Sequence, residues 1–212
     1  MLVKLLEYYK VEGAEWKARK ISEYLSNLSE KRDWAGLTSR GFYEKEEDAV
    51  VDSLGILSVL DRTERENLID IGSGGGIVGI VISIVCPEWD VVMAESSARK
   101  AAFLVEVIGS LELGNARVER DRAENLSSSM MFDAALGRAA GDLEKTARIA
   151  LGLLNTGGLY VAIKGSSVEA EVGDAIEAIG ASGGKLVGIE KPVYPEDFGI
   201  KDRVSLVVIR KI

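Results

Sequence analysis

The spacing of apolar residues changes near residue 60, and the change divides the chain into two parts. Before it, apolar residues recur at helical spacing in Leu2–Lys10 and Ile21–Leu28, and Glu46–Leu60 is predicted to be a further helix with acidic residues in its first turn. The intervening segment Asp33–Phe42 lacks this spacing and is predicted to be a loop. No linker composition separates the two parts, so residues 1–62 are expected to form a helical lobe packed on the remainder.

From residue 63 onward, short apolar runs bounded by turn residues alternate with segments of helical length. The predicted strands are Asn67–Ile71, Asp90–Ser96, Asn115–Glu119, Phe132–Gly137, Gly157–Gly165, Lys185–Lys191 and Arg203–Lys211. The predicted helices are Gly76–Val85, Ala98–Leu113, Gly141–Leu154 and Val168–Ile179. Alternating strands and helices imply a parallel sheet covered by helices on both faces.

The last two predicted strands have no helix between them, which determines how the sheet ends. Only residues 192–202 join them, so they are expected to form an antiparallel hairpin. Seven strands that end in such a hairpin fit the α/β class I methyltransferase fold, a Rossmann-like sheet, better than a six-stranded dinucleotide-binding fold. Residues 63–212 are therefore predicted to form one methyltransferase domain.

The first predicted strand leads directly into a glycine-rich segment, "NLIDIGSGGGIVGI", at residues 67–80. Five glycines fall within residues 72–79, and Gly74, Gly76 and Gly79 satisfy G-x-G-x-x-G. Such a loop lets the backbone approach a dinucleotide or S-adenosylmethionine, and a glycine-rich turn without a ligand is the simpler alternative.

Two acidic residues narrow the choice of ligand. Asp70 lies two residues before the first glycine and suits the cationic amino group of S-adenosylmethionine, whereas the pyrophosphate of a dinucleotide prefers a helix N-terminus without a neighbouring anion. Capping a helix or turn is the alternative role for Asp70. Glu95 lies near the end of the second strand, 21 residues after Gly74, where a carboxylate can accept hydrogen bonds from both ribose hydroxyls. Since both cofactors contain a ribose, Glu95 supports a nucleoside ligand and Asp70 favours S-adenosylmethionine.

Two features flank the fifth predicted strand. Asn155–Gly158 joins the preceding helix to it, and the glycines there fit a helix C-cap followed by a tight turn. Lys164 ends the strand at the edge where α/β sheets bind ligands, so it is either a substrate contact or a lysine that extends its charge into solvent.

Composition limits the chemistry and the partners. The chain has no histidine, which removes the commonest general base and metal ligand, and its single cysteine, Cys86, lies in an apolar run, as expected of a core residue in a reducing compartment. Lys4, Glu7 and Lys10 interrupt the N-terminal apolar groups, so no signal peptide or membrane span is predicted and the cytoplasm is the expected location. A net charge of −8 argues against a nucleic-acid substrate without excluding one. RNA could bind only through a local basic face, since charges beyond about 10 Å are largely screened at 0.1 M salt.

Strings along most of the chain resemble the RsmG (GidB) family of methyltransferases. They are "WAGLTS", "VVDSLGI", "LIDIGSGGGIVGIVISIVCPE", "AESSARKAAFLVEVIGSLELGNARV", "DRAENL", "FDAALGRA", "YVAIKG" and "LVVIRK", in the family's order and with similar spacing. The strings "RAE", "GRA" and "KG" are more specific than the glycine loop. The resemblance implies transfer of a methyl group from S-adenosylmethionine to N7 of a guanosine in bacterial 16S ribosomal RNA, free or in the small ribosomal subunit, by an enzyme expected to be a monomer without a metal.

The resemblance also implies which residues form the sites. At the cofactor these are Asp70, Gly72, Ser73, Gly74, Gly76, Ile77, Glu95, Ser96, Ala123, Glu124 and Arg138. Within this set, Glu95 would take the ribose, and Ala123 and Glu124 would flank the adenine. Arg138 and Lys164 would position the target in the catalytic site. The RNA contacts would be Arg122, Lys164 and Arg203. Simple solvation at the surface is the alternative for Arg122 and Arg138, although Arg138 directly follows a predicted buried strand.

The chain departs from the family pattern at several positions. Gly36 replaces the asparagine of the usual "NLT", and Ala49 replaces the histidine before "xxDS". Val78 and Val81 replace the prolines of the usual "GFPGIP" loop, and Arg203 is displaced by one position. These changes lie in the lobe and in the loop near the target, so the cofactor site is expected to be intact while loop flexibility or substrate access differs.

Methyl transfer to N7 suits a chain without histidine. The N7 atom of guanine has a lone pair and no proton, so attack on a methyl group needs no general base. The enzyme has to align the reacting atoms and exclude water, and positioning alone can contribute about 7–11 kcal/mol. Several basic side chains are expected to share the rim of the cofactor site, from the set Arg99, Lys100, Arg117, Arg120, Arg122, Arg138 and Lys164.

Three other functions agree with parts of the sequence. A methyltransferase for a small molecule or a protein agrees with the acidic charge and the altered lobe. An NAD-dependent oxidoreductase agrees with the glycine loop, although Asp70 and the terminal hairpin disfavour it. A non-catalytic protein that binds S-adenosylmethionine or ribosomes would have the same pocket without turnover.

Overall fold

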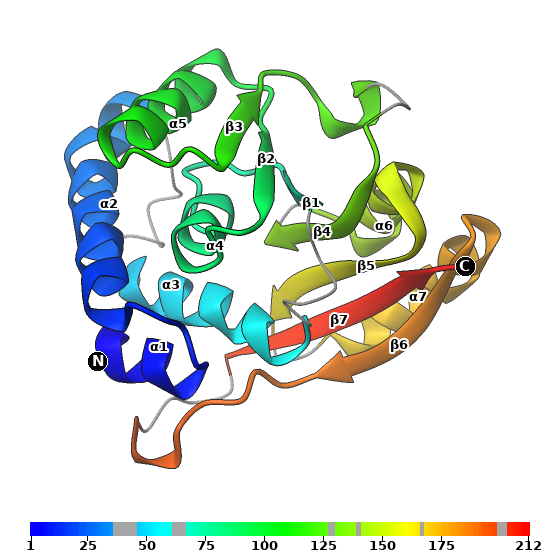
Figure 1. Cartoon of the computed structure of the whole chain (residues 1–212). Coiled ribbons are helices and arrows are strands. Elements are labelled where there is room, and N and C mark those ends of the chain that lie inside the picture. The colour runs from blue at the N-terminus through cyan, green and yellow to red at the C-terminus, as the bar shows by residue number, and fades with distance from the viewer. Residues whose placement is uncertain (36–45, 61–66, 127–129, 139–140, 166–167, 199–202) are drawn as a thin grey trace.

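The computed structural model describes residues 1–35, 46–60, 67–126, 130–138, 141–165, 168–198 and 203–212, which form one seven-stranded sheet with flanking helices (Figure 1). The strands are β1 (Asn67–Ile71), β2 (Asp90–Ala94), β3 (Ala116–Glu119), β4 (Phe132–Arg138), β5 (Leu154–Gly165), β6 (Gly184–Glu190) and β7 (Val204–Lys211). Their order is β3-β2-β1-β4-β5-β7-β6. Strands β1 to β5 pair in parallel, and β7 is antiparallel to both β5 and β6. The predicted sheet with its terminal antiparallel hairpin is confirmed.

Among the described residues, three helices precede the sheet and four lie along it. They are α1 (Leu2–Tyr8), α2 (Ala14–Ala35), α3 (Glu46–Leu54), α4 (Gly79–Val85), α5 (Ala98–Ser110), α6 (Leu143–Leu153) and α7 (Glu169–Ala181). Short 3-10 turns occur at Gly55–Ser58, Ala123–Asn125 and Glu196–Phe198. Helices α1 to α3 form the N-terminal lobe, and its predicted boundary near residue 62 lies outside the described residues.

Alternate residues of each strand point into two separate cores, because side chains of a strand alternate between its faces. Leu68 and Val91 pack on one face against the lobe helices, α4 and α5. Ile69 and Val92 pack on the other face against α6 and α7. Cys86, directly after α4, is fully buried in the first core, as predicted. The lobe therefore shares a continuous core with the sheet.

One predicted loop is partly wrong. Asp33–Ala35 belong to the last turn of α2 instead of to the loop predicted for Asp33–Phe42. The rest of that predicted loop, residues 36–42, lies outside the described part of the chain.

The predicted C-cap and turn at Asn155–Gly158 is also wrong, because β5 begins at Leu154, directly after α6. The pairing between β4 and β5 shifts its register over this segment, and Gly157 adopts φ of 85°. The glycine thus allows an irregularity inside a long strand, since a left-handed backbone conformation favours glycine.

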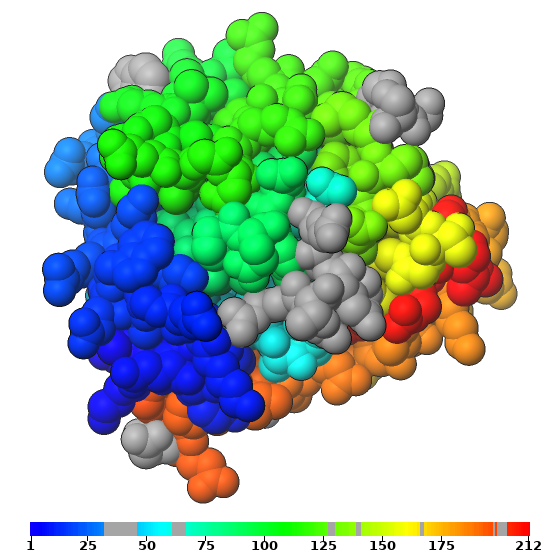
Figure 2. All heavy atoms as spheres, in the orientation of Figure 1, coloured from blue at the N-terminus to red at the C-terminus, as the bar shows by residue number. Residues whose placement is uncertain are grey.

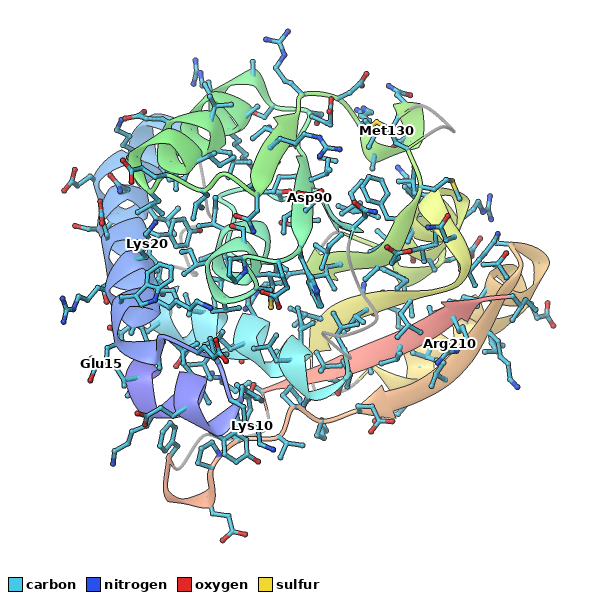
Figure 3. The ribbon with its side chains drawn as sticks, in the orientation of Figure 1. Lys10, Glu15, Lys20, Asp90, Met130 and Arg210 are labelled. Atoms are coloured by element: carbon cyan, nitrogen blue, oxygen red, sulfur yellow. The ribbon has the colours of Figure 1, made fainter. Side chains whose placement is uncertain are left out.

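Lysines of α2 dock the lobe by meeting the C-termini of two other helices. Lys17 is buried, and its Nζ donates a hydrogen bond of 2.9 Å to the carbonyl of Val85, the last residue of α4. Lys20, labelled on α2 in Figure 3, donates to the carbonyl of Leu111, which caps α5. Cations stabilise these positions because the last carbonyls of a helix lack partners within the helix and carry its negative dipole end. Figure 2 shows the resulting close contact between the surface of the lobe, in blue, and that of α5, in green.

Replacing Lys17 with methionine is expected to lower the free energy of unfolding by about 1–3 kcal/mol, since a charge-assisted hydrogen bond is lost and the Val85 carbonyl stays buried. Urea unfolding followed by circular dichroism measures this change. Arg19→Met, on the exposed side of the same helix, is the matched control and is expected to change stability by less than about 0.5 kcal/mol. Equal effects of the two substitutions would contradict the capping role.

Candidate active site

The glycine-rich loop follows β1 at the carboxyl edge of the sheet, where β1 lies between β2 and β4 and the strand order reverses. Its Gly72 N–H donates to the carbonyl of Ala94 at the end of β2, over 3.0 Å. Gly72, Gly74 and Gly76 all have positive φ, of 70°, 59° and 87°. At Gly76 a Cβ atom would lie only 2.6 Å from Leu104 Cδ2. This tight loop therefore requires glycine for both its backbone conformation and its packing.

Asp70 lies beneath the loop with only 2% of its surface exposed. Its Oδ2 accepts a hydrogen bond of 3.0 Å from the N–H of Gly79, the first residue of α4. Burial raises the pKa of the Asp70 carboxyl to about 7, although the hydrogen bond from Gly79 opposes the shift. Asp70 therefore caps the N-terminus of α4, and its carboxyl changes its charge near neutral pH.

Glu95 joins the loop to the start of α5. Its Oε2 accepts from Gly74 N–H over 2.9 Å, and its Oε1 accepts from Ser97 N–H over 2.7 Å. The residue is only 7% exposed, and Ser97 is the N-cap residue of α5. Because a carboxylate offers about four lone-pair positions, each oxygen can accept a second hydrogen bond from a ligand.

A tyrosine of the lobe reaches the same loop. Tyr24, on α2, is fully buried, and its hydroxyl donates a hydrogen bond of 2.8 Å to the carbonyl of Gly75. Burial, together with the nearby charges of Asp70 and Glu46, raises the pKa of Tyr24 well above its usual value, so the hydroxyl keeps the proton that it donates. Nothing in the sequence indicates this contact, since helical spacing alone predicts that Tyr24 is a core residue.

Replacing Tyr24 with phenylalanine is expected to leave the Gly75 carbonyl buried without this donor and to lower the free energy of unfolding by about 1–3 kcal/mol. The same variant should bind S-adenosylmethionine about tenfold more weakly, since a factor of ten corresponds to 1.4 kcal/mol of lost loop order. Urea unfolding and isothermal titration calorimetry provide the two measurements. Tyr8→Phe, at an exposed tyrosine of α1, is the control, and a Tyr24→Phe variant that matches it would contradict the contact.

A cavity of about 360 Å³ opens beside the loop at the ends of β1 and β2. The predicted site residues that line it are Gly72, Glu95, Ser96, Arg122, Ala123 and Glu124. The other predicted cofactor residues do not border this cavity: Asp70, Ser73, Gly74, Gly76 and Ile77 form or support the loop, and Arg138 lies at the end of β4. Ile77 is buried in the core with an exposed fraction of 6%.

The cavity also contains residues that the sequence reasoning missed. Helix α6 contributes Lys145, Thr146 and Ile149, and Asp142 is the N-cap residue of that helix. Asp121, directly before the "RAE" string, also lines the cavity. The only sequence signal was the predicted helix start near residue 141, which gave no reason to place its first turn beside the cofactor strand.

The charges around this cavity do not form the predicted basic rim. Of the seven basic residues expected there, only Arg122 lines the cavity, and its side chain lies 3.8 Å from Glu124. The lining residues with a formal charge are four acids and two bases: Glu95, Asp121, Glu124 and Asp142 against Arg122 and Lys145. The prediction fails because strand-end residues spread over several directions, although their positions in the sequence look alike.

Arg138 and Arg203 lie together on the other side of the loop. Arg138 Nη2 is 3.2 Å from Asp52 Oδ2, and Arg203 Nη2 is 3.1 Å from Asp52 Oδ1. Arg138 also donates to the carbonyl of Ala49, the residue that stands in place of the family's histidine. Burial lowers the pKa of Arg138, and the Asp52 carboxylate opposes that shift.

Lys164 ends β5 in a paired environment. Its Nζ donates to Glu171 Oε1 over 2.8 Å and to the carbonyl of Gly141 over 2.6 Å, and only 10% of the side chain is exposed. Leu143 N–H donates to the same Glu171 oxygen. Lys164 thus ties β5 to α7 and to the start of α6.

Two of the family's loop prolines are replaced here by residues of the hydrophobic core. Val78 and Val81 are 3% and 0% exposed. Their side chains pack inward beside α4 and do not line the cavity. Gly36, another departure from the family pattern, lies outside the described residues.

Within the described ranges, no three histidine, cysteine, aspartate or glutamate side chains come together in a way that could hold a metal ion. None of the helices in these ranges is long and apolar enough to cross a membrane.

A sheet with this strand order, whose glycine loop and strand-end carboxylate border one cavity, defines a class I methyltransferase fold. Solved structures agree at the level of the fold. Precorrin-6y C5,15-methyltransferase from Geobacter metallireducens GS-15 superposes with a TM-score of 0.57 over 82% of this chain and 92% of that one, at 16% identity. The M. jannaschii TYW2 structure in complex with AdoMet gives a TM-score of 0.58 over 83% and 78%, at 15% identity.

Sequence comparison assigns the family. The profile of the GidB family, rRNA small subunit methyltransferase G, matches residues 17–193. The chain is 33% identical to ribosomal RNA small subunit methyltransferase G of Caldicellulosiruptor bescii, over all of this chain and 91% of that protein. It is 34% identical to the protein of the same name from Pelotomaculum thermopropionicum, over 93% and 84%. The chain therefore belongs to the GidB family and is an S-adenosylmethionine-dependent methyltransferase.

Proposed function

We propose that this protein transfers a methyl group from S-adenosylmethionine to N7 of a guanosine in 16S ribosomal RNA, acting as a monomer in the cytoplasm. The observation that carries the proposal is the family match over residues 17–193, which spans both the lobe and the cofactor edge of the sheet. Relatives named ribosomal RNA small subunit methyltransferase G cover most of the chain.

The residues around the cavity fit the nucleoside part of S-adenosylmethionine. Glu95 is a buried carboxylate with lone pairs left for two ribose hydroxyls. Ala123 and Ile149 offer apolar surface to a flat base, and the cavity of about 360 Å³ lies within the usual range for small-molecule sites. The glycine loop would hold the methionine part above Asp70. When bound, S-adenosylmethionine supplies an electrophilic methyl group on a sulfonium.

The chain's own residues then have to position the target and exclude water. No side chain needs to remove a proton, because N7 of guanine presents a free lone pair, which agrees with the absence of histidine. Arg138 and Arg203 offer planar donors at the carboxyl edge of the sheet, and such donors suit the phosphates and the oxygen and nitrogen acceptors of guanine. The acidic lining of the cofactor cavity favours RNA contacts on the side of these two arginines over contacts at the cavity itself.

The test uses small ribosomal subunits whose 16S RNA lacks N7-methylguanosine, the purified protein and S-adenosylmethionine labelled in its methyl group. The expected result is label at a single guanosine, mapped by chemical cleavage at N7-methylguanosine and primer extension. The Glu95→Gln variant serves as the control for cofactor-dependent transfer.

Two outcomes would replace the proposal by one of its alternatives. Labelling of protein or of a small-molecule fraction, with none in RNA, would favour a different methyl acceptor. Binding of S-adenosylmethionine without transfer to free RNA or to subunits would favour the non-catalytic function.

A further inference from the structure

A buried carboxylate of the lobe is shared by two guanidinium groups of the sheet. Asp52, on α3, has a side chain that is only 5% exposed, and its two oxygens lie 3.2 Å from Arg138 and 3.1 Å from Arg203. A buried charge costs several kcal/mol unless it is paired, so this position is specific for an acid that has both partners. Neither the family resemblance nor the pattern of residues along the chain predicts a role for Asp52.

The two arginines come from distant parts of the chain and meet at the same edge of the sheet. Arg138 is the last residue of β4, and Arg203 directly precedes β7, whose first residue, Val204, pairs with Gly165 at the end of β5. They are separated from Asp52 by 86 and 151 residues in the sequence. This edge is the one that contains the glycine loop.

Helix α3 provides acceptors in addition to Asp52. Arg138 Nη1 donates to the Ala49 carbonyl over 3.1 Å. Arg203 Nη2 donates to the Asp48 carbonyl over 3.2 Å, and its Nη1 lies 2.6 Å from the Asp48 carboxylate. One helix thus orients both planar groups, whose side chains keep 21% and 30% exposure.

We propose that Asp52 is a positioning residue, which holds the Arg138 and Arg203 guanidinium groups side by side in the orientation that receives the target guanosine and its phosphate. Two cations that share one carboxylate repel each other once the carboxylate is removed. Each arginine would also regain side-chain conformational freedom. The inference rests on the proposed RNA substrate and adds the residue that makes the lobe part of the active site.

The test is the variant Asp52→Asn, compared with Glu47→Gln, an exposed acid on the same helix. Asparagine keeps one acceptor oxygen and presents an amide donor to the other arginine. We expect kcat for 16S RNA to fall about 100-fold, which corresponds to about 2.7 kcal/mol, while the Kd for S-adenosylmethionine changes less than threefold. The ¹⁵N–¹H signals of the arginine Nε groups should shift or broaden for Arg138 and Arg203 in Asp52→Asn and stay unchanged in Glu47→Gln.

A double variant distinguishes positioning from general stability. If Asp52 acts partly through Arg138, Asp52→Asn combined with Arg138→Met should lose less turnover than the product of the two single losses. Should Asp52→Asn fail to fold, Asp52→Glu keeps the charge but displaces the carboxylate, and its kcat should also fall while its affinity for S-adenosylmethionine is kept.

Several results would overturn the inference. One is a kcat equal to that of wild type in Asp52→Asn or in Asp52→Glu. Another is a loss of kcat in the double variant that equals the product of the two single losses. The third is a set of Arg138 and Arg203 Nε signals that do not change in Asp52→Asn. If the wild-type protein methylates no RNA, both the proposed function and this inference are wrong. That failure is distinguishable from a failure of the inference alone, because it is seen with the wild-type protein before any substitution is made.

Discussion

Replacing Glu95 with glutamine is expected to raise the Kd for S-adenosylmethionine about 100-fold. The carboxylate accepts from Gly74 N–H with one oxygen and from Ser97 N–H with the other. Glutamine has only one acceptor oxygen, so its amide NH₂ group must face one of these two backbone donors. Hydrogen bonds to charged groups contribute about 1.5–3 kcal/mol each, and the loss of one such bond, with weaker ribose contacts, accounts for about 2.7 kcal/mol.

The matched control for Glu95→Gln is Glu119→Gln. Glu119 ends β3, the strand next to β2, and thus lies at the same edge of the sheet. Its carboxylate is 3.7 Å from Arg117 and does not line the cavity. Isothermal titration calorimetry should show a Kd within twofold of wild type for Glu119→Gln. A Glu95→Gln variant with a Kd within threefold of wild type would contradict the ribose contact and show that its bonds to the loop contribute little to cofactor binding.

Periodicity predicted the elements of the sheet, because residues such as Leu68 and Ile69 have to alternate between two cores. Spacing also placed Glu95 beside the glycine loop, since the ends of adjacent parallel strands meet at one edge. The prediction of a C-cap and turn at Asn155–Gly158 is wrong because it rests on a common local pattern, helix–Gly–Gly–strand. In the structure, the tertiary pairing of β5 with β4 extends the strand through this segment.

The contacts between lobe and sheet could not be predicted in the same way. Tyr24 meets Gly75 across 51 residues, and Asp52 meets Arg203 across 151. Such pairs depend on how α2 and α3 pack against the sheet, and neither helical spacing nor the resemblance fixes that packing. The prediction of a basic rim was wrong for a related reason. The direction of a basic side chain at a strand end depends on which neighbouring helix supplies an acid, and here α3 pairs with Arg138 and α7 pairs with Lys164.

Replacing Asp70 with asparagine is expected to stabilise the protein at alkaline pH while weakening its affinity for S-adenosylmethionine. In the folded protein burial raises the pKa of Asp70 to about 7, against a usual value of 3.8. Between about pH 4 and pH 7 the folded state therefore holds a proton that the unfolded state has released. The contribution of Asp70 to stability falls as the pH rises through this window and is constant above it. Asparagine resembles the protonated acid, and its carbonyl oxygen can still accept from Gly79 N–H.

The gain in the free energy of unfolding of Asp70→Asn over wild type should therefore be larger at pH 8 than at pH 5, by about 2–3 kcal/mol. Urea unfolding at the two pH values measures this difference in gain, and an equal gain, or a loss at pH 8, would contradict the raised pKa.

The same substitution should weaken cofactor binding. Without the anion beneath the loop, the Kd for S-adenosylmethionine at pH 8 is expected to rise at least tenfold. Asp90→Asn, at an exposed position at the opposite end of β2 (Figure 3), should leave that Kd unchanged. These two results together would show that ionised Asp70 lowers stability and yet strengthens binding. They are expected if Asp70 interacts with the cationic cofactor in addition to capping α4.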